Sequence, residues 1–222
     1  MRQLLALLCV LLPAGALAQV DPEPPPNPAT PDPGVRCVIE TDCLALAADT
    51  AERLGEELVL RLGNGTTRVF RDDRKSCADL DADLCVEHRL VAYLPASGAI
   101  VVAWNGSETG GAILVDPVTG AETRLPAEPA FSPSGRRLVC LGRDETDRDD
   151  DVAVYARRDG AWVEETRFSG GPPDRPEAWS LDRWDGDDRI GFTYRSAIGE
   201  GKAVMTWDGQ GWQVDKGGPA RP

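Results

Sequence analysis

The densest group of potential metal ligands in this sequence is the acidic run Asp144–Asp151. Asp147, Asp149 and Asp151 alternate along it, and alternating carboxylates are typical of calcium-binding loops, because a hard cation prefers several oxygen ligands at close range. The rest of the run departs from that pattern, with valine at the sixth position in place of glycine and arginine at the twelfth in place of glutamate. We therefore expect a solvated acidic loop and keep calcium binding as the alternative.

A second group that could bind a ligand is Trp179, Asp182, Arg183 and Trp184. An aromatic platform beside a carboxylate and a guanidinium group could hold a sugar or a peptide through apolar faces and directional polar groups. Tryptophan is also a large apolar residue that fills the space between strands. Packing is therefore the simpler interpretation of the two tryptophans, and ligand binding is the alternative.

Catalytic motifs are scarce. His88 is the one histidine in the chain, so a histidine-rich metal site is excluded, and a Ser-His-Asp triad would have to use this residue. The sequence has no Gly-x-Ser-x-Gly elbow, phosphate-binding loop or His-Glu-x-x-His motif, and it predicts no cofactor other than the possible calcium ion. The 37 acidic residues could still supply two converging carboxylates that act as acid and base. A carboxylate-dependent glycosidase or other hydrolase is therefore the alternative function.

The N-terminal segment predicts export. Residues 1–18 contain one basic residue, a short apolar run and the small-residue site Ala16-Leu17-Ala18, which is the pattern of a secretory signal peptide. Residues 19–34 hold seven prolines and predict an extended linker. No segment is long and apolar enough to predict a membrane span. We expect a periplasmic or secreted protein.

Cysteine content agrees with an oxidising compartment. Five cysteines follow the signal peptide, which favours two disulfides and one remaining thiol. Nearness in sequence favours Cys77 with Cys85 and, less strongly, Cys37 with Cys43, although other pairings stay open. Cys140 lies in an apolar run, so we expect a buried, inert thiol.

Net charge limits the possible partners. The formal net charge is −13 at neutral pH, and phosphate backbones and anionic lipid surfaces would repel such a chain. Nucleic acid is therefore not an expected partner, whereas an envelope protein or a glycan is possible.

Residues 35–216 predict one folded domain, followed by a short tail at 217–222. The stretch 42–57 has a loose helical face, although residues 43–47 also alternate like a strand. Two β-rich runs flank an Asn-Gly turn at residues 58–70 and predict a hairpin.

From Arg89 onward the sequence repeats a unit of four strands joined by glycine turns. Equivalent first turns contain Gly98, Gly135 and Gly186. Each copy approximates a strand, a turn, a strand, a loop, a strand, a turn and a strand, although the first strand is clear only in the first copy. This pattern predicts antiparallel four-stranded meanders.

The clearest copy of the repeat runs from Phe131 to Val139 and reads Phe-Ser-Pro-Ser-Gly-Arg-Arg-Leu-Val. It resembles the repeat of TolB-type and related WD40-like β-propellers, in which Ser-Pro-Asp-Gly-Lys precedes an apolar strand. The resemblance covers residues 89–215 and implies blades, but no catalytic residues. We expect an all-β domain in the form of a small or incomplete β-propeller, with an open meander or a β-sandwich as alternatives.

These features together favour an exported binding or scaffolding module over an enzyme. The interpretation depends on the structural repeat and on the lack of catalytic motifs. A structural envelope protein without a small ligand is a further possibility.

Overall fold

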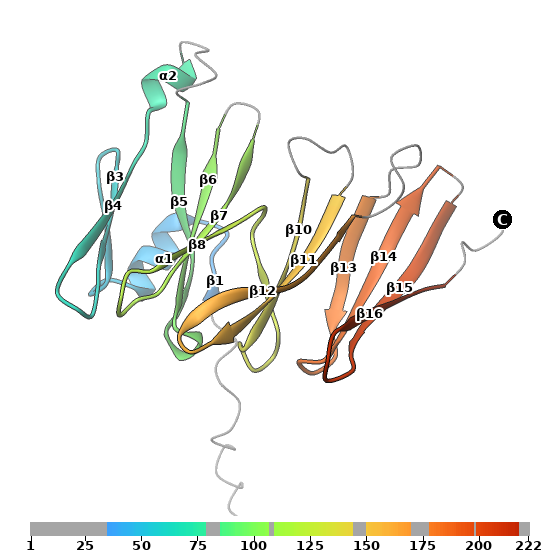
Figure 1. Ribbon diagram of the computed structural model, residues 1–222. Coiled ribbons are helices and arrows are strands. Elements are labelled where there is room, and N and C mark those ends of the chain that lie inside the picture. Colours follow the sequence, from blue (N-terminus) through green and yellow to red (C-terminus); the bar gives the residue numbers. More distant parts are fainter. Residues whose placement is uncertain are drawn as a thin grey trace, which may run out of the picture.

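The computed structural model describes residues 35–78, 85–106, 109–143, 150–169, 178–197 and 199–217 (Figure 1). These ranges are built mainly from antiparallel β-strands, as the sequence predicts. The helical segments are α1 (Glu40–Leu46), α2 (Arg74–Ala78) and η1 (Pro95–Ser97). The strands are β1 (Val35–Arg36), β2 (Ala51–Leu54), β3 (Glu57–Arg61), β4 (Thr67–Arg71), β5 (Glu87–Leu94), β6 (Ala99–Asn105), β7 (Gly110–Val115), β8 (Glu122–Leu125), β9 (Ala130–Phe131), β10 (Arg137–Arg143), β11 (Asp150–Arg158), β12 (Ala161–Ser169), β13 (Ala178–Trp184), β14 (Arg189–Ser196), β15 (Gly199–Trp207) and β16 (Trp212–Lys216).

The strands form four antiparallel sheets, which we number along the chain. The first sheet has the order β2-β3-β4, and the second has the order β1-β5-β6-β7-β8. The third has the order β12-β11-β10-β9, and the fourth has the order β13-β14-β15-β16. Apart from β1, each strand pairs with its neighbours in sequence, so every sheet is a meander. The three sequence repeats therefore form the predicted four-stranded units, and the predicted hairpin forms β3 and β4.

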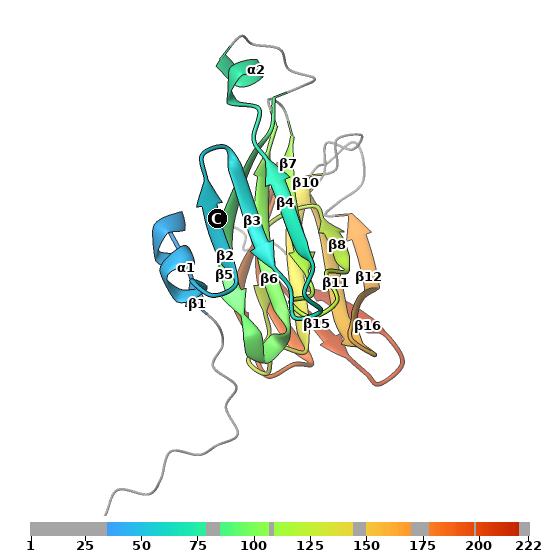
Figure 2. The ribbon, with the colours of Figure 1, turned by 90° about the vertical axis from the view of Figure 1, so that its left-hand side faces the viewer.

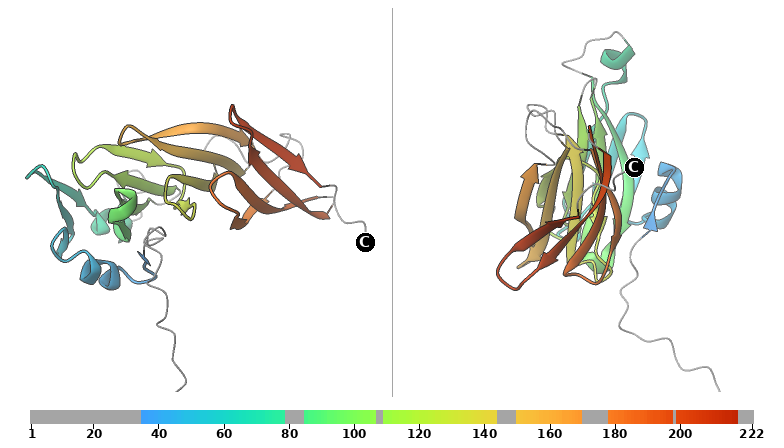
Figure 3. Two further views of the ribbon diagram at one scale, coloured as in Figure 1. Left: turned by 90° about the horizontal axis from the view of Figure 1, so that it is seen from below. Right: turned by 90° about the vertical axis from the view of Figure 1, so that its right-hand side faces the viewer.

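The sheets stack face to face (Figure 3). Apolar side chains fill each gap between them. Strand β10 packs into the gaps on both sides of the third sheet, because successive side chains of a strand point to opposite faces. Leu138 and Cys140 pack with the residues of the second sheet, whereas Val139 packs with the fourth. All three side chains are almost fully buried, and their burial holds the third sheet between its neighbours.

The first and fourth sheets lie at opposite ends of this stack (Figures 1 and 3). The outward face of the fourth sheet is polar: the carboxylate of Asp182 accepts hydrogen bonds from Thr193 at 2.7 Å and from Lys202 at 2.8 Å. Such a face is stable in water and does not need a further sheet. The four stacked meanders agree with the predicted all-β class, whereas a β-sandwich would contain two packed sheets.

Turns of consecutive sheets contact one another along one end of the stack. Gly98, Gly135 and Gly186 all have positive φ, at 57°, 69° and 67°, which is the backbone conformation that favours glycine. The Ser97 hydroxyl occupies the space where a Cβ atom of residue 135 would lie. In the next pair, the backbone N–H of Ser134 donates to the carboxylate of Asp187 at 3.3 Å. The predicted turns therefore also connect the sheets.

The N-terminal part of the described chain differs from the expectation for residues 42–57. Helix α1 ends at Leu46, and residues 51–54 form strand β2 instead of continuing the helix. Packing explains the difference, because Ala51 pairs with Leu60 of β3 and is buried against the second sheet. Figure 2 shows α1 beside the first sheet and α2 projecting beyond the strands.

Both predicted disulfides are present. Cys37 pairs with Cys43 and Cys77 pairs with Cys85, with Cα–Cα distances of 5.5 Å and 4.4 Å. Cys140 forms no disulfide and is buried, as predicted. The two disulfides indicate an oxidising compartment outside the cytoplasm. Within the described ranges, none of the helices has the length and apolar character needed to cross a bilayer.

Candidate ligand-binding cleft

The residues of the predicted aromatic platform lie on β13 but face different sides of the fourth sheet. Trp179 is buried and packs against Phe192 and Tyr194 in the gap to the third sheet. Trp184 faces the same gap, and its indole N–H donates to the carbonyl of Ala130 at 3.1 Å. The tryptophans thus have the packing positions that the simpler interpretation expects.

The polar members of the predicted platform are exposed. Asp182 is the extra residue of a β-bulge, since Leu181 pairs with Phe192 and Arg183 pairs with Gly191. Its carboxylate lies on the outward face described above, away from the two tryptophans. Ligand binding by these four residues stays a prediction, but they do not line one common surface.

The predicted calcium ligands are only partly described. Asp147 and Asp149 lie outside the described residues, and Asp151 is described only as backbone of β11. In the parts of the chain that the structure does describe, no three His, Cys, Asp or Glu side chains form a metal-binding group. Calcium binding by the acidic run stays a prediction.

His88 takes part in a buried polar network. Its backbone N–H donates to Asp72 at 2.7 Å, and the guanidinium of Arg53 contacts both Asp72 and Glu40. The side chain of Asp72 is fully buried, and burial also lowers the pKa of His88 despite the nearby Asp72 carboxylate. The network joins α1 and the first sheet to β5, which is a structural role.

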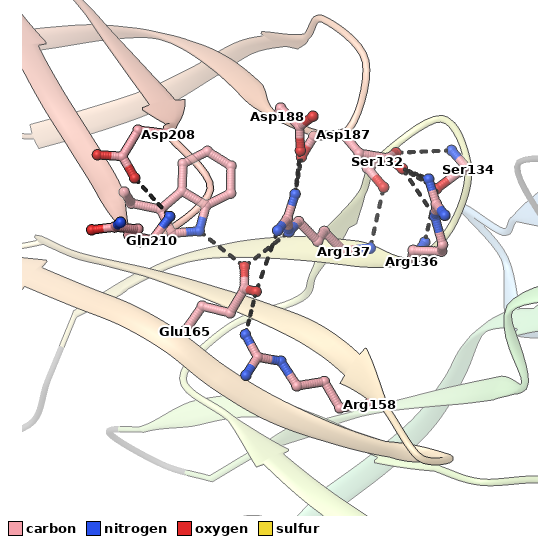
Figure 4. Close-up of polar contacts among 11 residues, drawn as sticks. Ser132, Ser134, Arg136, Arg137, Arg158, Glu165, Asp187, Asp188, Asp208 and Gln210 are labelled. Atoms are coloured by element: carbon pink, nitrogen blue, oxygen red, sulfur yellow. Dashed lines mark hydrogen bonds and ion pairs between the residues drawn. The ribbon is translucent and has the colours of Figure 1, made fainter.

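A polar cleft lies between the third and fourth sheets, near the ends of strands β10, β11, β14 and β15 (Figure 4). Its volume is about 350 Å³. The residues that line it are Arg136, Arg137, Ala156, Arg157, Arg158, Glu165, Asp187, Asp188 and Trp207. It therefore combines guanidinium groups, carboxylates and one indole ring at a boundary between two sheets.

Glu165 is the central acceptor of this cleft. Its carboxylate accepts hydrogen bonds from Arg137 at 2.9 Å, Arg158 at 2.8 Å and the indole N–H of Trp212 at 3.0 Å. A β-bulge in β12 explains its orientation, because Val154 pairs with Thr166 and Tyr155 pairs with Glu164, leaving Glu165 as the extra residue. Bulges commonly redirect a side chain in this way.

These contacts keep Glu165 ionised. Only 2% of its side chain is exposed, and burial by itself would raise its pKa. Hydrogen bonds from Trp212, Arg158 and Arg137 outweigh burial, so that the pKa of Glu165 lies below its ordinary value of 4.5. The residue is therefore a charged anchor for the surrounding donors.

Arg137 crosses from the third sheet to the fourth. Its guanidinium carbon lies 4.7 Å from the ring centroid of Trp207 and 5.4 Å from that of Trp212. The same group donates to the backbone carbonyl of Asp187 at 3.2 Å and to the carboxylate of Asp188. Only 14% of the side chain is exposed, so Arg137 is part of the wall of the cleft.

Asp187 holds a second group of contacts beside Arg137. Its carboxylate accepts a hydrogen bond from the hydroxyl of Ser134 and forms an ion pair with Arg136 at 3.0 Å (Figure 4). Burial opposes ionisation of this carboxyl, but donors that include Ser134 and Arg136 lower its pKa below the ordinary value of 3.8. Asp187 thus connects the turn of the third sheet to that of the fourth.

Two carboxylates of the cleft, Glu165 and Asp187, do not suit general acid catalysis. A glycosidase needs one carboxylic acid whose pKa is raised, so that it can protonate the leaving group. Glu165 and Asp187 both have lowered pKa values and are occupied by basic or hydroxyl donors. Neither of these two groups is therefore the raised-pKa acid that such a hydrolase needs.

The sequence contains some of the signals of this cleft but does not connect them. The repeat copy from Phe131 to Val139 contains Arg136 and Arg137 directly after the turn glycine. No local pattern connects these arginines to Glu165 or Trp207, because the residues come from different strands. No family model matches this chain, and no curated protein has a matching sequence.

Proposed function

We propose that this protein is an exported binding module that holds a glycan in the cleft between its third and fourth sheets. The observation that carries this proposal is the cleft of about 350 Å³ with Glu165 at its centre. Its volume is within the usual range of small-ligand sites, about 300 to 1,000 Å³.

Export is the first part of the proposal. The two disulfides support an oxidising compartment, and the pattern of residues 1–18 adds the expectation of a signal peptide. We infer a periplasmic or secreted location, where envelope glycans are available partners.

The propeller-like architecture is the second part. Four stacked meanders, three of which contain four strands in sequence order, support an incomplete propeller of the TolB-type or WD40-like class. Propeller blades present turns at the ends of adjacent sheets, and such turns are suitable places for binding residues. The cleft is built from turns of this kind.

Glycan binding is the third part. Guanidinium and carboxylate groups are planar and can form paired hydrogen bonds with neighbouring sugar hydroxyls. An indole such as Trp207 offers an apolar surface beside them. The cleft brings all three kinds of group together in a space without a raised-pKa carboxyl at Glu165 or Asp187.

Binding can be measured by screening the purified protein against an array of neutral and acidic glycans, followed by calorimetry on the glycans that bind. Asp188→Ala removes an exposed carboxylate that lines the cleft, and we expect it to weaken binding about tenfold. Asp185→Ala is the matched control, because Asp185 lies on the same turn with similar exposure but does not line the cleft.

Two results would count against this function. One is an array on which no glycan binds the folded protein. The other is a glycan that binds wild type, Asp188→Ala and Asp185→Ala with the same affinity, because that glycan would then occupy another surface. Thermal unfolding of each variant checks that the fold is retained.

A further inference from the structure

We infer that the glycan held in this cleft is acidic, and that Arg136 and Arg158 bind carboxylates of its uronic acid residues. The inference rests on the proposed function and adds the chemical class of the ligand. Some guanidinium groups of the cleft are already paired within the protein, whereas others have N–H groups that a ligand could use.

Two of the four lining arginines are occupied by the protein itself. Arg137 donates to Glu165 and Asp188 and lies against two indole rings. Arg157 crosses to the second sheet, where it donates to the carbonyl of Ser97 and to Asp116 at 3.2 Å. These two side chains shape the cleft and have little capacity left for a ligand.

The other two arginines are open to solvent. The side chains of Arg136 and Arg158 are 79% and 56% exposed, respectively. Arg136 uses Nε and Nη2 on Ser134 and Asp187, while Arg158 uses only Nη2, on Glu165. Within the described ranges no acceptor contacts Nη1 of Arg136, or Nε and Nη1 of Arg158. Each guanidinium therefore presents unused N–H groups at the cleft.

A carboxylate fits these unused donors better than a neutral hydroxyl does. It has two oxygens in one plane, which match the fork of a guanidinium group, and charge-assisted hydrogen bonds are about twice as strong as neutral ones. Two of the carboxylates that line the cleft are already occupied by other donors. Glu165 accepts hydrogen bonds from three residues, and Asp187 is held by Ser134 and Arg136.

The charge of the remaining protein increases the selectivity of this site. The whole chain has a formal net charge of −13, so an acidic glycan is repelled from most of the surface. The cleft is lined by four arginines and three acidic residues, which makes it a local exception. The lining of the cleft therefore carries a formal charge of +1, opposite in sign to that of the whole chain.

Calorimetric titration with uronic acid oligosaccharides tests the inference. The probes are oligomers of galacturonic, glucuronic and mannuronic acid, each compared with its methyl ester, which keeps the sugar but removes the charge. We expect at least one acid to bind about tenfold or more tightly than its ester in low-salt buffer. Added salt should reduce this difference.

Three variants assign the carboxylate to its binding residues. Arg136→Gln and Arg158→Gln should each weaken binding of the acid about tenfold and leave binding of the ester nearly unchanged. Arg189→Gln is the control, since Arg189 is 54% exposed and does not line the cleft. Arg158 and Arg136 also pair with Glu165 and Asp187, so thermal unfolding of each variant checks that the fold is retained before binding of the acid and the ester is compared.

The outcomes separate this inference from the proposed function. A neutral glycan that binds in an Asp188-dependent manner, with acids and esters bound equally, overturns the inference and leaves glycan binding intact. If sulfated oligosaccharides bind and uronic acids do not, the uronic acid assignment is overturned. If no glycan of any class binds, both proposals are overturned.

Discussion

The guanidinium group of Arg137 lies over the ring of Trp207 and joins the third sheet to the fourth. A cation over an indole ring contributes about 0.5 to 2 kcal/mol of stability, and the higher values apply to pairs that are shielded from water. Glu165 supplies the opposite charge at 2.9 Å, so the arginine has both an ionic and an aromatic partner. The same side chains therefore form the wall of the cleft and the contact between the two sheets.

The Glu165→Gln variant should be less stable by about 2 to 4 kcal/mol, because Arg137 would lose its buried counter-charge. A glutamine amide, which has one acceptor oxygen, could also not accept hydrogen bonds from all three residues that donate to Glu165. Urea unfolding of both proteins measures the difference. Glu164→Gln is the control: Glu164 is 38% exposed and pairs with Arg167, so its loss should cost about 1 kcal/mol or less. Equal losses in the two variants would contradict the central role of Glu165.

Acid should destabilise the protein through the same cleft. The pKa values of Glu165 and Asp187 are lowered below 4.5 and 3.8, so their contribution to stability is complete above those values. The contribution is lost as the pH falls through the lowered pKa of the folded state, because the unfolded chain binds protons first. Urea unfolding between neutral pH and about pH 3 should show this loss. Glu165→Gln should lose less stability over that range, and an equal loss would argue against Glu165 as a source of the effect.

Much of the fold was predictable, because its signals are local. The turn glycines and the alternating apolar strands predict the meanders, and nearness in sequence predicts both disulfides. The first strands of the third and fourth sheets were harder to find. Strand β9 has only two residues, and the bulge at Asp182 breaks the alternation of β13.

The cleft could not be predicted, because its contacts are distant in sequence. Glu165 is 28 residues from Arg137 and 47 residues from Trp212, and its side chain is directed by a bulge that breaks the strand period. Period-two alternation counted from Trp162 and from Phe168 assigns Glu165 to opposite faces, because the bulge lies between them. Long-range pairing and bulges therefore mark the limit of what local patterns predict here.

The Gly135→Ala variant should be destabilised by about 2 kcal/mol or more, of which about 1 to 2 comes from the left-handed backbone. The remainder arises because the new methyl group would overlap the Ser97 hydroxyl of the second sheet. Gly160→Ala is the control, since Gly160 has φ 83° and no atom within 4 Å of the added carbon. The Gly160→Ala variant should therefore lose only the stability that the left-handed backbone accounts for.

A double variant tests the contact between these two turns. Ser97→Ala combined with Gly135→Ala removes the hydroxyl that the new methyl group would meet, so the double variant should lose less stability than the sum of its single variants. Chemical unfolding of the four proteins gives the coupling energy. Simple additivity would mean that the two turns do not interact as described.

The Cys140 thiol should be protected from alkylation as long as the protein is folded. The residue is fully buried between β9 and β11 and packs against the second sheet. Iodoacetamide should therefore label its peptide only in concentrated guanidinium chloride, as measured by mass spectrometry. The Cys37–Cys43 and Cys77–Cys85 peptides should stay unlabelled in both conditions until a reductant is added. Labelling of Cys140 in the native protein would show that the third sheet opens.

The Trp184→Ala variant distinguishes packing from ligand binding at the predicted aromatic platform. Trp184 donates its indole N–H to Ala130 and packs edge-on against Trp212, so we expect a loss of about 2 to 4 kcal/mol of stability. Asp182→Ala is the companion variant, because Asp182 is on the outward face and should cost about 1 kcal/mol or less. Chemical unfolding and glycan titration are measured on both. If Trp184→Ala retains full stability but no longer binds a glycan, the platform is a ligand site. If it loses stability while Asp182→Ala binds normally, the platform is part of the packing between the third and fourth sheets.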